Sequence, residues 1–348
     1  MGLRHQVKSA LARWVLHKRR GLFEGEARPA PHDEATHDWD GRRRFAEDYT
    51  FVALQPELAL LVRLEWLPGR AAHRLWVIAL GEDEAYCNPQ AQAVVADAAA
   101  DRWRVAGLEL DCLRPLARWS IGYRGPLLAA DDPASNVARI PVQRACELEL
   151  VFDADRDPFV PGVDDDPELV ARRLGEAAWD AELVRSVRRA SQRGYVQLGT
   201  ITGTLALGDT AIAVNAQALR QHTWGVRDWG GPHRAVQCFA TGEGARAWIQ
   251  RAQFPAFTLE GGFVARGDAA PVAIQDLRHV DDDTGDERSL ALELPDGPLH
   301  WQGRRMRALE LRVDGRGALD VALVRGEGDR VALWATQRRT LPGLVRQR

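Results

Sequence analysis

Residues 195–229 read YVQLGTITGTLALGDTAIAVNAQALRQHTWGVRDW and carry the strongest fold signal in the chain. The stretch contains two strand-like runs, YVQLGTITGTLAL and TAIAVNAQAL, separated by a glycine and an aspartate. The second run continues into QHTWGVRDW, which brings an imidazole, a guanidinium, a carboxylate and two indoles into nine residues. These groups suit a catalytic or binding site, and they equally suit a polar strand end with two core tryptophans.

The strand pattern extends outward from this stretch into two blocks. Runs such as RACELELVF alternate apolar and polar residues between Tyr49 and about Phe152, and similar runs resume from Tyr195 to about Leu341. Residues 167–191 instead place apolar side chains at helical spacing and predict one helix or two short ones. Antiparallel strands spaced in this way favour barrels or sandwiches over a parallel α/β sheet. The predicted parts are an N-terminal helix and linker (1–40), a first β domain (41–160), a helical connector (161–192) and a second β domain (193–348).

The first twenty residues, MGLRHQVKSALARWVLHKRR, predict an amphipathic helix with six positive charges and no negative ones. Such a helix can lie in an anionic membrane interface, or it can dock on the body of the protein with its charges in solvent. His17, Lys18, Arg19 and Arg20 end its apolar stretch too early for a signal peptide. We therefore expect a cytoplasmic protein, with peripheral membrane contact through residues 1–20 as the open alternative.

Composition and motifs exclude several classes of function. The net charge of −3 gives no basic field for nucleic acid, and the four cysteines are too far apart for a zinc-finger or disulfide pattern. Neither a phosphate-binding P-loop motif nor a G-x-S-x-G nucleophile motif occurs. An acidic loop that begins at Asp153 lacks the glycine and glutamate of a calcium loop. Four residues before the first strand could cluster on a metal but fit a polar linker better, so we predict no metal and no cofactor: His32, Asp33, His37 and Asp38.

Alternation along an extended strand places His222, Trp224 and Asp228 on one face and Arg227 and Trp229 on the other. Gly225 interrupts this pattern, and a glycine inside a strand is typical of a bulge that re-aims its neighbours. A bulge would bring His222 or Arg227 into one pocket with Asp228. In the structural alternative, Arg227 pairs with a carboxylate at a barrel mouth and the two indoles plug the end.

The 195–229 stretch also resembles the hallmark region of the carotenoid 1,2-hydratase superfamily, which includes hydroxyneurosporene synthase and related hydratases and cyclases. Its motif, Arg-Asp-His-Ser-Trp-Gly-x-Arg, is matched by five identical residues: Arg220, His222, Trp224, Gly225 and Arg227. Thr223 replaces the serine and Gln221 replaces the aspartate. The resemblance implies an all-β protein of two lipocalin-like antiparallel β-barrels joined by a helical connector.

The resemblance further implies a cofactor-independent lyase or isomerase, either a hydratase or a cyclase, that acts on a hydrophobic isoprenoid, steroid-like or polyketide substrate. In this interpretation His222 is the general base, and Asp228 is an acid whose pKa burial would raise and Arg227 would lower. Five further side chains are expected to bind the substrate: Trp224, Trp229, Trp119, Tyr195 and Tyr123.

Two alternatives remain at this point. A pericyclic cyclisation would need no acid, only a shaped apolar pocket between the two barrels. A non-catalytic carrier of a lipid or isoprenoid would use the same pocket without chemistry. The glutamine at position 221 favours the carrier, whereas His222 and Arg227 favour the enzyme. The predicted partner in each case is a hydrophobic small molecule.

Overall fold

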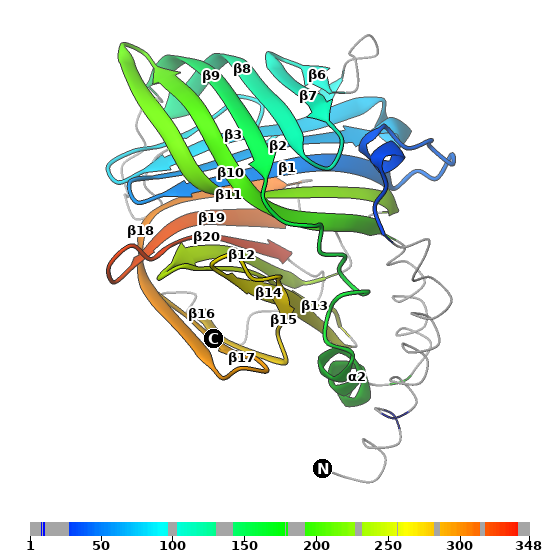
Figure 1. Ribbon diagram of the computed structural model, residues 1–348. Coiled ribbons are helices and arrows are strands. Elements are labelled where there is room, and N and C mark those ends of the chain that lie inside the picture. Colours follow the sequence, from blue (N-terminus) through cyan, green and yellow to red (C-terminus); the bar gives the residue numbers. More distant parts are fainter. Residues whose placement is uncertain are drawn as a thin grey trace, which may run out of the picture.

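The computed structural model describes residues 8, 10, 28–96, 103–129, 142–177, 179, 192–226, 232–255, 257–281, 286–313 and 317–339. Within these residues strands predominate and form two antiparallel sheets, one above the other in Figure 1. The prediction of an all-β, lipocalin-like chain is confirmed.

Eight strands close the first sheet into a barrel. Their order around the barrel is β1, β2, β3, β4, β8, β9, β10 and β11, and β11 pairs with β1. Closure depends on the short strand β4, which pairs with both β3 and β8. The bounds are β1 Phe45–Gln55, β2 Leu58–Leu67, β3 Ala72–Gly81, β4 Ala85–Cys87, β8 Arg118–Ala129, β9 Gln143–Ala154, β10 Arg193–Leu207 and β11 Thr210–Val226. Three further strands extend this sheet: β5 Val95–Ala96 pairs with β3, β7 Leu108–Arg114 pairs with β8, and β6 Arg104–Val105 pairs with β7.

The second sheet has nine strands in the order β15, β14, β13, β12, β20, β19, β18, β17 and β16. Its edge strands β15 and β16 do not pair with each other in the part of the chain that the structure describes. The second predicted barrel is therefore a curled half-barrel. The bounds are β12 Arg234–Gly242, β13 Ala245–Gln253, β14 Thr258–Arg266, β15 Val272–Ala273, β16 Asp276–Asp281, β17 Glu287–Glu293, β18 Leu299–Val313, β19 Gly317–Gly326 and β20 Val331–Arg339.

The division between the sheets falls later in the chain than the boundary at residue 193 predicts. β10 and β11 form a long hairpin whose outer partners are β9 and β1, so both strands belong to the closed barrel. The first sheet thus ends at Val226 and the second begins at Arg234. The sequence did not reveal that β10 and β11 belong to the first sheet, because a helical connector between β9 and β10 resembles a domain boundary.

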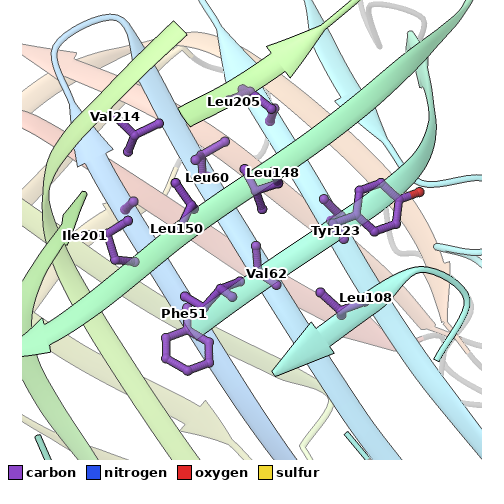
Figure 2. Packing of buried hydrophobic residues seen from close by; sticks show 14 of the residues in the cluster. Phe51, Leu60, Val62, Leu108, Tyr123, Leu148, Leu150, Ile201, Leu205 and Val214 are labelled. Atoms are coloured by element: carbon purple, nitrogen blue, oxygen red, sulfur yellow. The ribbon is translucent and has the colours of Figure 1, made fainter. Parts of the chain in front are cut away.

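The middle of the closed barrel is filled by apolar side chains from opposite walls. Figure 2 shows residues of β1, β2, β7, β8, β9, β10 and β11 pointing toward one another across the interior. They include Phe51, Val62, Leu150, Ile201 and Val214, and all five are buried. Strand alternation explains the filling, since every second residue of each strand faces inward.

The outward-facing residues of the barrel build a second core against the half-barrel. Val52, Leu61 and Leu219 of the barrel belong to one buried cluster with Trp248 and Phe263 of the second sheet. The predicted pocket between the two units is therefore occupied, in this cluster, by packed side chains. The two sheets bury apolar surface against each other, which is the dominant stabilising contribution at such contacts.

The helical connector is shorter than predicted. Helix α2 spans Pro167–Glu176, and the Asp166 carboxylate caps it by accepting bonds from the backbone N–H groups of Glu168 and Leu169. Most of residues 178–191 lie outside the described residues.

The predicted N-terminal helix also lies outside the described residues, except for Lys8 and Ala10, which are helical. Lys8 Nζ donates a hydrogen bond to the Ala177 carbonyl at 3.0 Å, which favours the docked alternative over the membrane-bound one. Among the described residues no helix has the length and apolar character that crossing a membrane requires.

Candidate active site at one end of the closed barrel

The polar residues of β11 gather inside the barrel at the end where β1 begins. Ala216 and Ala218 belong to the interior core and Leu219 to the exterior one, so alternation turns Arg220, His222 and Trp224 inward. All three were named by the resemblance or by the predicted site. Thr223 faces away, and its hydroxyl donates to Asp48 Oδ2 at 2.6 Å.

Gly225 does not produce the predicted bulge. The pairing of β1 with β11 runs without a shift from Phe45 opposite Val226 to Leu54 opposite Gln217. The glycine instead takes a φ of +117°, a backbone conformation that other residues avoid. The inward direction of His222 and Trp224 is thus set by simple alternation.

A buried ion pair closes this end of the barrel. Glu34 lies in the short 3-10 helix η1, Pro31–Glu34, and reaches into the barrel from outside. Arg220 Nη1 and Nη2 donate to its two carboxylate oxygens at 2.7 and 2.8 Å. Trp119 Nε1 donates to the same carboxylate at 2.8 Å, and the Tyr195 hydroxyl donates to it as well. The carboxylate therefore accepts four hydrogen bonds from three barrel residues.

Aromatic rings surround the guanidinium of Arg220. Its Cζ lies 5.2 Å from the ring centroid of Tyr195, 5.6 Å from Trp119 and 5.7 Å from Phe152. Such contacts stabilise a buried cation through the negative face of each ring. Gly199 leaves space for the Phe152 ring, because a Cβ atom at this position would lie 2.7 Å from it.

Charge and burial act in opposite directions on the pair. Burial alone would raise the pKa of Glu34, but the hydrogen bond and positive charge of Arg220 outweigh it and hold the pKa below its ordinary value. Burial raises the pKa of Tyr195 well above 10, so its hydroxyl keeps its proton and donates. Glu34 and Arg220 are therefore both charged at neutral pH, and both oxygens of the Glu34 carboxylate accept hydrogen bonds.

A second buried carboxylate, Glu47, lies between two histidines. His222 Nε2 is 3.0 Å from Glu47 Oε1, and His37 Nδ1 is 2.9 Å from the same oxygen. The His37 backbone N–H also donates to Glu47 Oε2 at 3.0 Å. The side chains of Glu47 and His222 are 0% exposed, whereas that of His37 is 22% exposed. The three groups connect a fully buried imidazole to the surface.

Stacked rings hold the two imidazoles. The Tyr49 ring stacks on His222 with centroids 4.0 Å apart, and the Trp224 ring stacks on His37 at the same distance. The Tyr49 hydroxyl donates to the Glu34 backbone carbonyl at 3.0 Å, so Tyr49 contacts both the His222 group and the Glu34 plug. The two polar groups form one continuous site.

The electrostatics keep His222 neutral and Glu47 ionised. Burial lowers the pKa of His222, and the hydrogen bond to Glu47 offsets only part of that shift. Burial would raise the pKa of Glu47, but hydrogen bonds from His222 and then His37 lower it below its ordinary value. A neutral His222 donates its Nε2–H to the anionic Glu47, which leaves Nδ1 without a proton. Nδ1 is buried and has no hydrogen-bond partner among the described residues.

The same three residues could hold a divalent cation, since one ligand atom from each lies within 4.8 Å of the others. A metal bound through His222 Nε2 would require the Nδ1–H to donate to an outer acceptor. Within the described part of the chain no such acceptor is present. The cluster therefore fits acid–base chemistry better than metal binding, and the absence of a metal stays a prediction.

The structure brings together only part of the predicted site. His222, Trp224, Trp119 and Tyr195 meet at this end of the barrel. Tyr123 does not join them, because its hydroxyl donates to the Pro126 carbonyl on its own strand, and burial raises its pKa to about 12. The remaining three predicted residues lie outside the described residues: Arg227, Asp228 and Trp229.

Sequence reasoning missed both carboxylates of the site. Glu47 had a signal, because it interrupts the apolar inward face that Phe45, Tyr49 and Phe51 share. Glu34 had none, since it stands in a stretch that resembles a polar linker. His37 was considered with that linker and set aside, and the structure places it beside Glu47.

Comparison with known proteins places the chain in a family. The profile of a domain of unknown function, DUF7064, matches residues 30–329. The chain belongs to this family. The match begins just before η1 and so includes every residue of the site described above. No curated protein matches the sequence.

Several solved structures resemble the fold at low sequence identity. A protein assigned as AttH from Nitrosomonas europaea is 10% identical, with 90% of this chain and 97% of that one covered and a TM-score of 0.46. A structure of CghA with Sch210972 is 11% identical, with 85% and 88% covered and a TM-score of 0.45. Kievitone hydratase from Nectria haematococca is 8% identical, with 84% and 87% covered and a TM-score of 0.43.

Proposed function

We propose that this protein is an enzyme of the lyase or isomerase class that acts on a hydrophobic small molecule at the Glu34 end of the closed barrel. The observation that carries the proposal is the state of His222. His222 Nε2 lies 3.0 Å from Glu47 Oε1, and Nδ1 is buried without a partner among the described residues, so Nδ1 is the proton acceptor when Nε2 carries the proton. This is the arrangement of a general base held in one tautomer by a carboxylate.

Each group then has a role in proton transfer. In dehydration His222 Nδ1 removes a proton from the carbon next to the one that bears the hydroxyl, and the imidazolium passes this proton to the departing hydroxide, which leaves as water. Hydration of the alkene runs through the same transfers in reverse. Glu47 fixes the ring and stabilises the imidazolium that forms. His37 shares Glu47 and is part-exposed, so it offers a route for proton exchange with solvent.

The walls of the site suit an apolar substrate. Trp119, Tyr195 and Trp224 surround the polar groups, and their faces can stabilise positive charge that develops on an alkene. The Tyr195 hydroxyl keeps its proton and can orient an oxygen of the substrate. Asp228 and Arg227 follow β11 directly in sequence and stay proposed as the acid and its modulator.

Packing speaks against the carrier alternative. A carrier of the lipocalin type holds its ligand inside the barrel. The interior of this barrel is occupied by buried side chains such as Phe51, Leu148 and Leu150 (Figure 2). A ligand at the polar end would contact acid–base groups first, which favours chemistry over storage.

The test compares extracts of small molecules before and after incubation with the purified protein. Mass spectrometry should detect a compound that gains or loses one water, or an isomer of unchanged mass. His222→Gln should lower the rate of that conversion by about 10²- to 10⁴-fold, the usual contribution of a general base. Tyr123→Phe is the matched control, because Tyr123 is also buried in the barrel but lies away from the site. Equal rates in wild type and His222→Gln would refute the proposal.

A further inference from the structure

We propose that Arg220, Trp119 and Tyr195 form a receptor for the carboxylate of a small apolar acid, and that Glu34 is a tethered plug that occupies this receptor in the absence of ligand. The inference deepens the proposed function by naming the class of substrate. It rests on that function only for the reaction that follows binding.

The receptor binds both oxygens of a carboxylate from one side. Arg220 donates to both, Trp119 donates to Oε2 and Tyr195 donates to Oε1. All three donors belong to barrel strands, and the acceptor comes from a segment at least 85 residues away in sequence. A planar guanidinium that meets a carboxylate through two parallel bonds gives strong and specific recognition.

The receptor is positioned by contacts that do not involve Glu34. Arg220 Nη2 also donates to Gln197 Oε1 at 2.8 Å, and Gln197 is held by bonds from its Nε2 to the carbonyls of Leu116 and Arg156, both at 2.8 Å. Three aromatic rings enclose the guanidinium. Arg220 Nε is buried without a partner in the described part of the chain, so the guanidinium has a spare donor. Arg220 should therefore keep its place when the plug leaves.

The plug side chain projects from a segment that is anchored on both sides of it, by Arg28 on Asp164 and by His37 on Glu47. Within Pro31–Thr36 only Glu34 is buried, and Pro31, His32 and Ala35 are exposed. The segment before it is tied by a bidentate pair between Arg28 and Asp164, with both bonds at 2.7 Å. Because these anchors lie on either side of Glu34 and its immediate neighbour Ala35 is exposed, the Glu34 side chain can leave the receptor while the rest of the segment stays attached.

A permanent structural plug would not need charge. Two well-packed apolar side chains stabilise a protein as well as a buried ion pair does, because burial of each ion costs solvation. The barrel nevertheless keeps a cation and two further donors at its end. These groups match a carboxylate ligand, and the rings of Tyr49, Trp119 and Tyr195 around them match an apolar or aromatic substituent.

The site of chemistry lies next to the receptor. Tyr49 donates to the Glu34 backbone carbonyl and its ring stacks on His222, and the Tyr195 ring, whose hydroxyl donates to Glu34, lies 5.6 Å from that of His222. A ligand whose carboxylate replaced that of Glu34 would place its adjacent carbons along the path of the plug, near His222. The substrate class is thus a carboxylic acid with an apolar substituent.

The experiment measures binding of 3-phenylpropanoate to the full chain by calorimetry, with 3-phenylpropan-1-ol as the uncharged analogue. A tethered ligand competes at a millimolar effective concentration, so Glu34→Ala should bind the acid at least about tenfold more tightly than wild type. The affinity for the alcohol should be the same in Glu34→Ala as in wild type. Glu34→Leu/Arg220→Met, which removes both charges, should not bind the acid. Glu34→Gln, which removes the charge but leaves the side chain in the receptor, should show a smaller gain in the same direction and replaces the alanine variant if that variant does not fold.

The matched control is Glu260→Ala. Glu260 is a buried carboxylate of the half-barrel that accepts a hydrogen bond from Arg173 Nε at 2.6 Å. It also forms an ion pair with Arg251, whose Nε lies 2.9 Å from Glu260 Oε1. If Glu260→Ala gains as much affinity for the acid as Glu34→Ala does, then any buried arginine that loses its carboxylate partner binds the acid. The proposal of a specific receptor would then be wrong. An unchanged affinity in both Glu34 variants, or an equal gain for the alcohol, would also overturn the inference.

His222→Gln separates this inference from the proposed function. If the acid binds to Glu34→Ala and to Glu34→Ala/His222→Gln alike, the receptor is correct whatever the chemistry. If conversion of some compound depends on His222 but no variant binds the acid, the enzyme proposal survives and the receptor is wrong.

Discussion

The closed barrel and the half-barrel share strand geometry but differ in what they turn inward. The barrel collects Glu34, Glu47, Arg220 and His222 at one end, all buried. The corresponding buried cluster of the half-barrel is apolar, with residues such as Val236, Leu290, Trp301 and Trp334. Its buried carboxylate Glu260 pairs instead with Arg173 of the connector helix α2.

This difference indicates that the closed barrel carries the functional site, whereas the half-barrel has a structural role. Burying several ionisable groups together is costly, and proteins retain such clusters chiefly where they act. In the half-barrel a charge pair ties a helix to a sheet. In the barrel the charges face an enclosed end with aromatic walls. We therefore expect substitutions in the two regions to affect different quantities.

The largest effect should be on catalysis. Glu47→Gln leaves His222 without its orienting carboxylate, and we expect turnover to fall by about 10²-fold or more, because the general base loses its tautomer and its stabilised cation. The equivalent change in the half-barrel, Glu260→Gln, should leave turnover unchanged. Steady-state rates of the conversion identified above check this pair. Similar losses in both variants would mean that the half-barrel contributes to the site.

The next effect is on stability. Arg220→Met leaves the Glu34 carboxylate buried without its cation and should lower the free energy of unfolding by about 3–5 kcal/mol. Adding Glu34→Leu should restore most of it, because the pair is then apolar. Arg251→Met should lower the free energy of unfolding by less, because the Glu260 carboxylate still pairs with Arg173. Urea unfolding of the wild type and the three variants measures these differences. A double variant no more stable than Arg220→Met alone would show that the ion pair is not the source of the loss.

The third effect is the response to pH. The pKa of His222 is lowered in the folded protein, so the unfolded chain binds more protons below its ordinary value of 6.5. Stability should therefore fall as the pH decreases through this value. The lowered pKa values of Glu34 and Glu47 add a second loss in more acidic solution, below their ordinary value of 4.5.

Thermal unfolding across this pH range tests the assignment. His222→Gln should remove the loss that begins near pH 6.5, whereas His300→Gln, at an exposed position of the half-barrel, should retain it. If the loss persists in His222→Gln, another group causes it.

The smallest effect should come from the tie that precedes the plug. Arg28→Ala removes the exposed pair with Asp164 and should cost at most about 1 kcal/mol of stability. Because the plug is then less restrained, 3-phenylpropanoate should bind more tightly to this variant than to wild type. Calorimetry beside urea unfolding checks both. A stability loss as large as that of Arg220→Met would show that the segment is held by this pair.

Local patterns predicted much of the barrel and part of its site. The two strand-like runs of residues 195–229 form β10 and β11, and alternation placed His222 and Trp224 on one face. Gln221, which stands where the related motif has aspartate, alternates to the outer face of β11, so its replacement removes nothing from the inward cluster. Gly225 misled the prediction because a glycine with positive φ and a bulge have the same sequence signature.

What the sequence alone determined is the content of each strand, since a period of two records which side chains share a face. Only the tertiary structure decided which strands close the barrel, that β10 and β11 belong to the first sheet, and that Glu34 reaches Arg220 across 186 residues. The physical reason is that pairing and burial between distant segments depend on the whole packed core. No local sequence pattern distinguishes Glu34. Its role becomes visible only from the four hydrogen bonds that its carboxylate accepts inside the barrel.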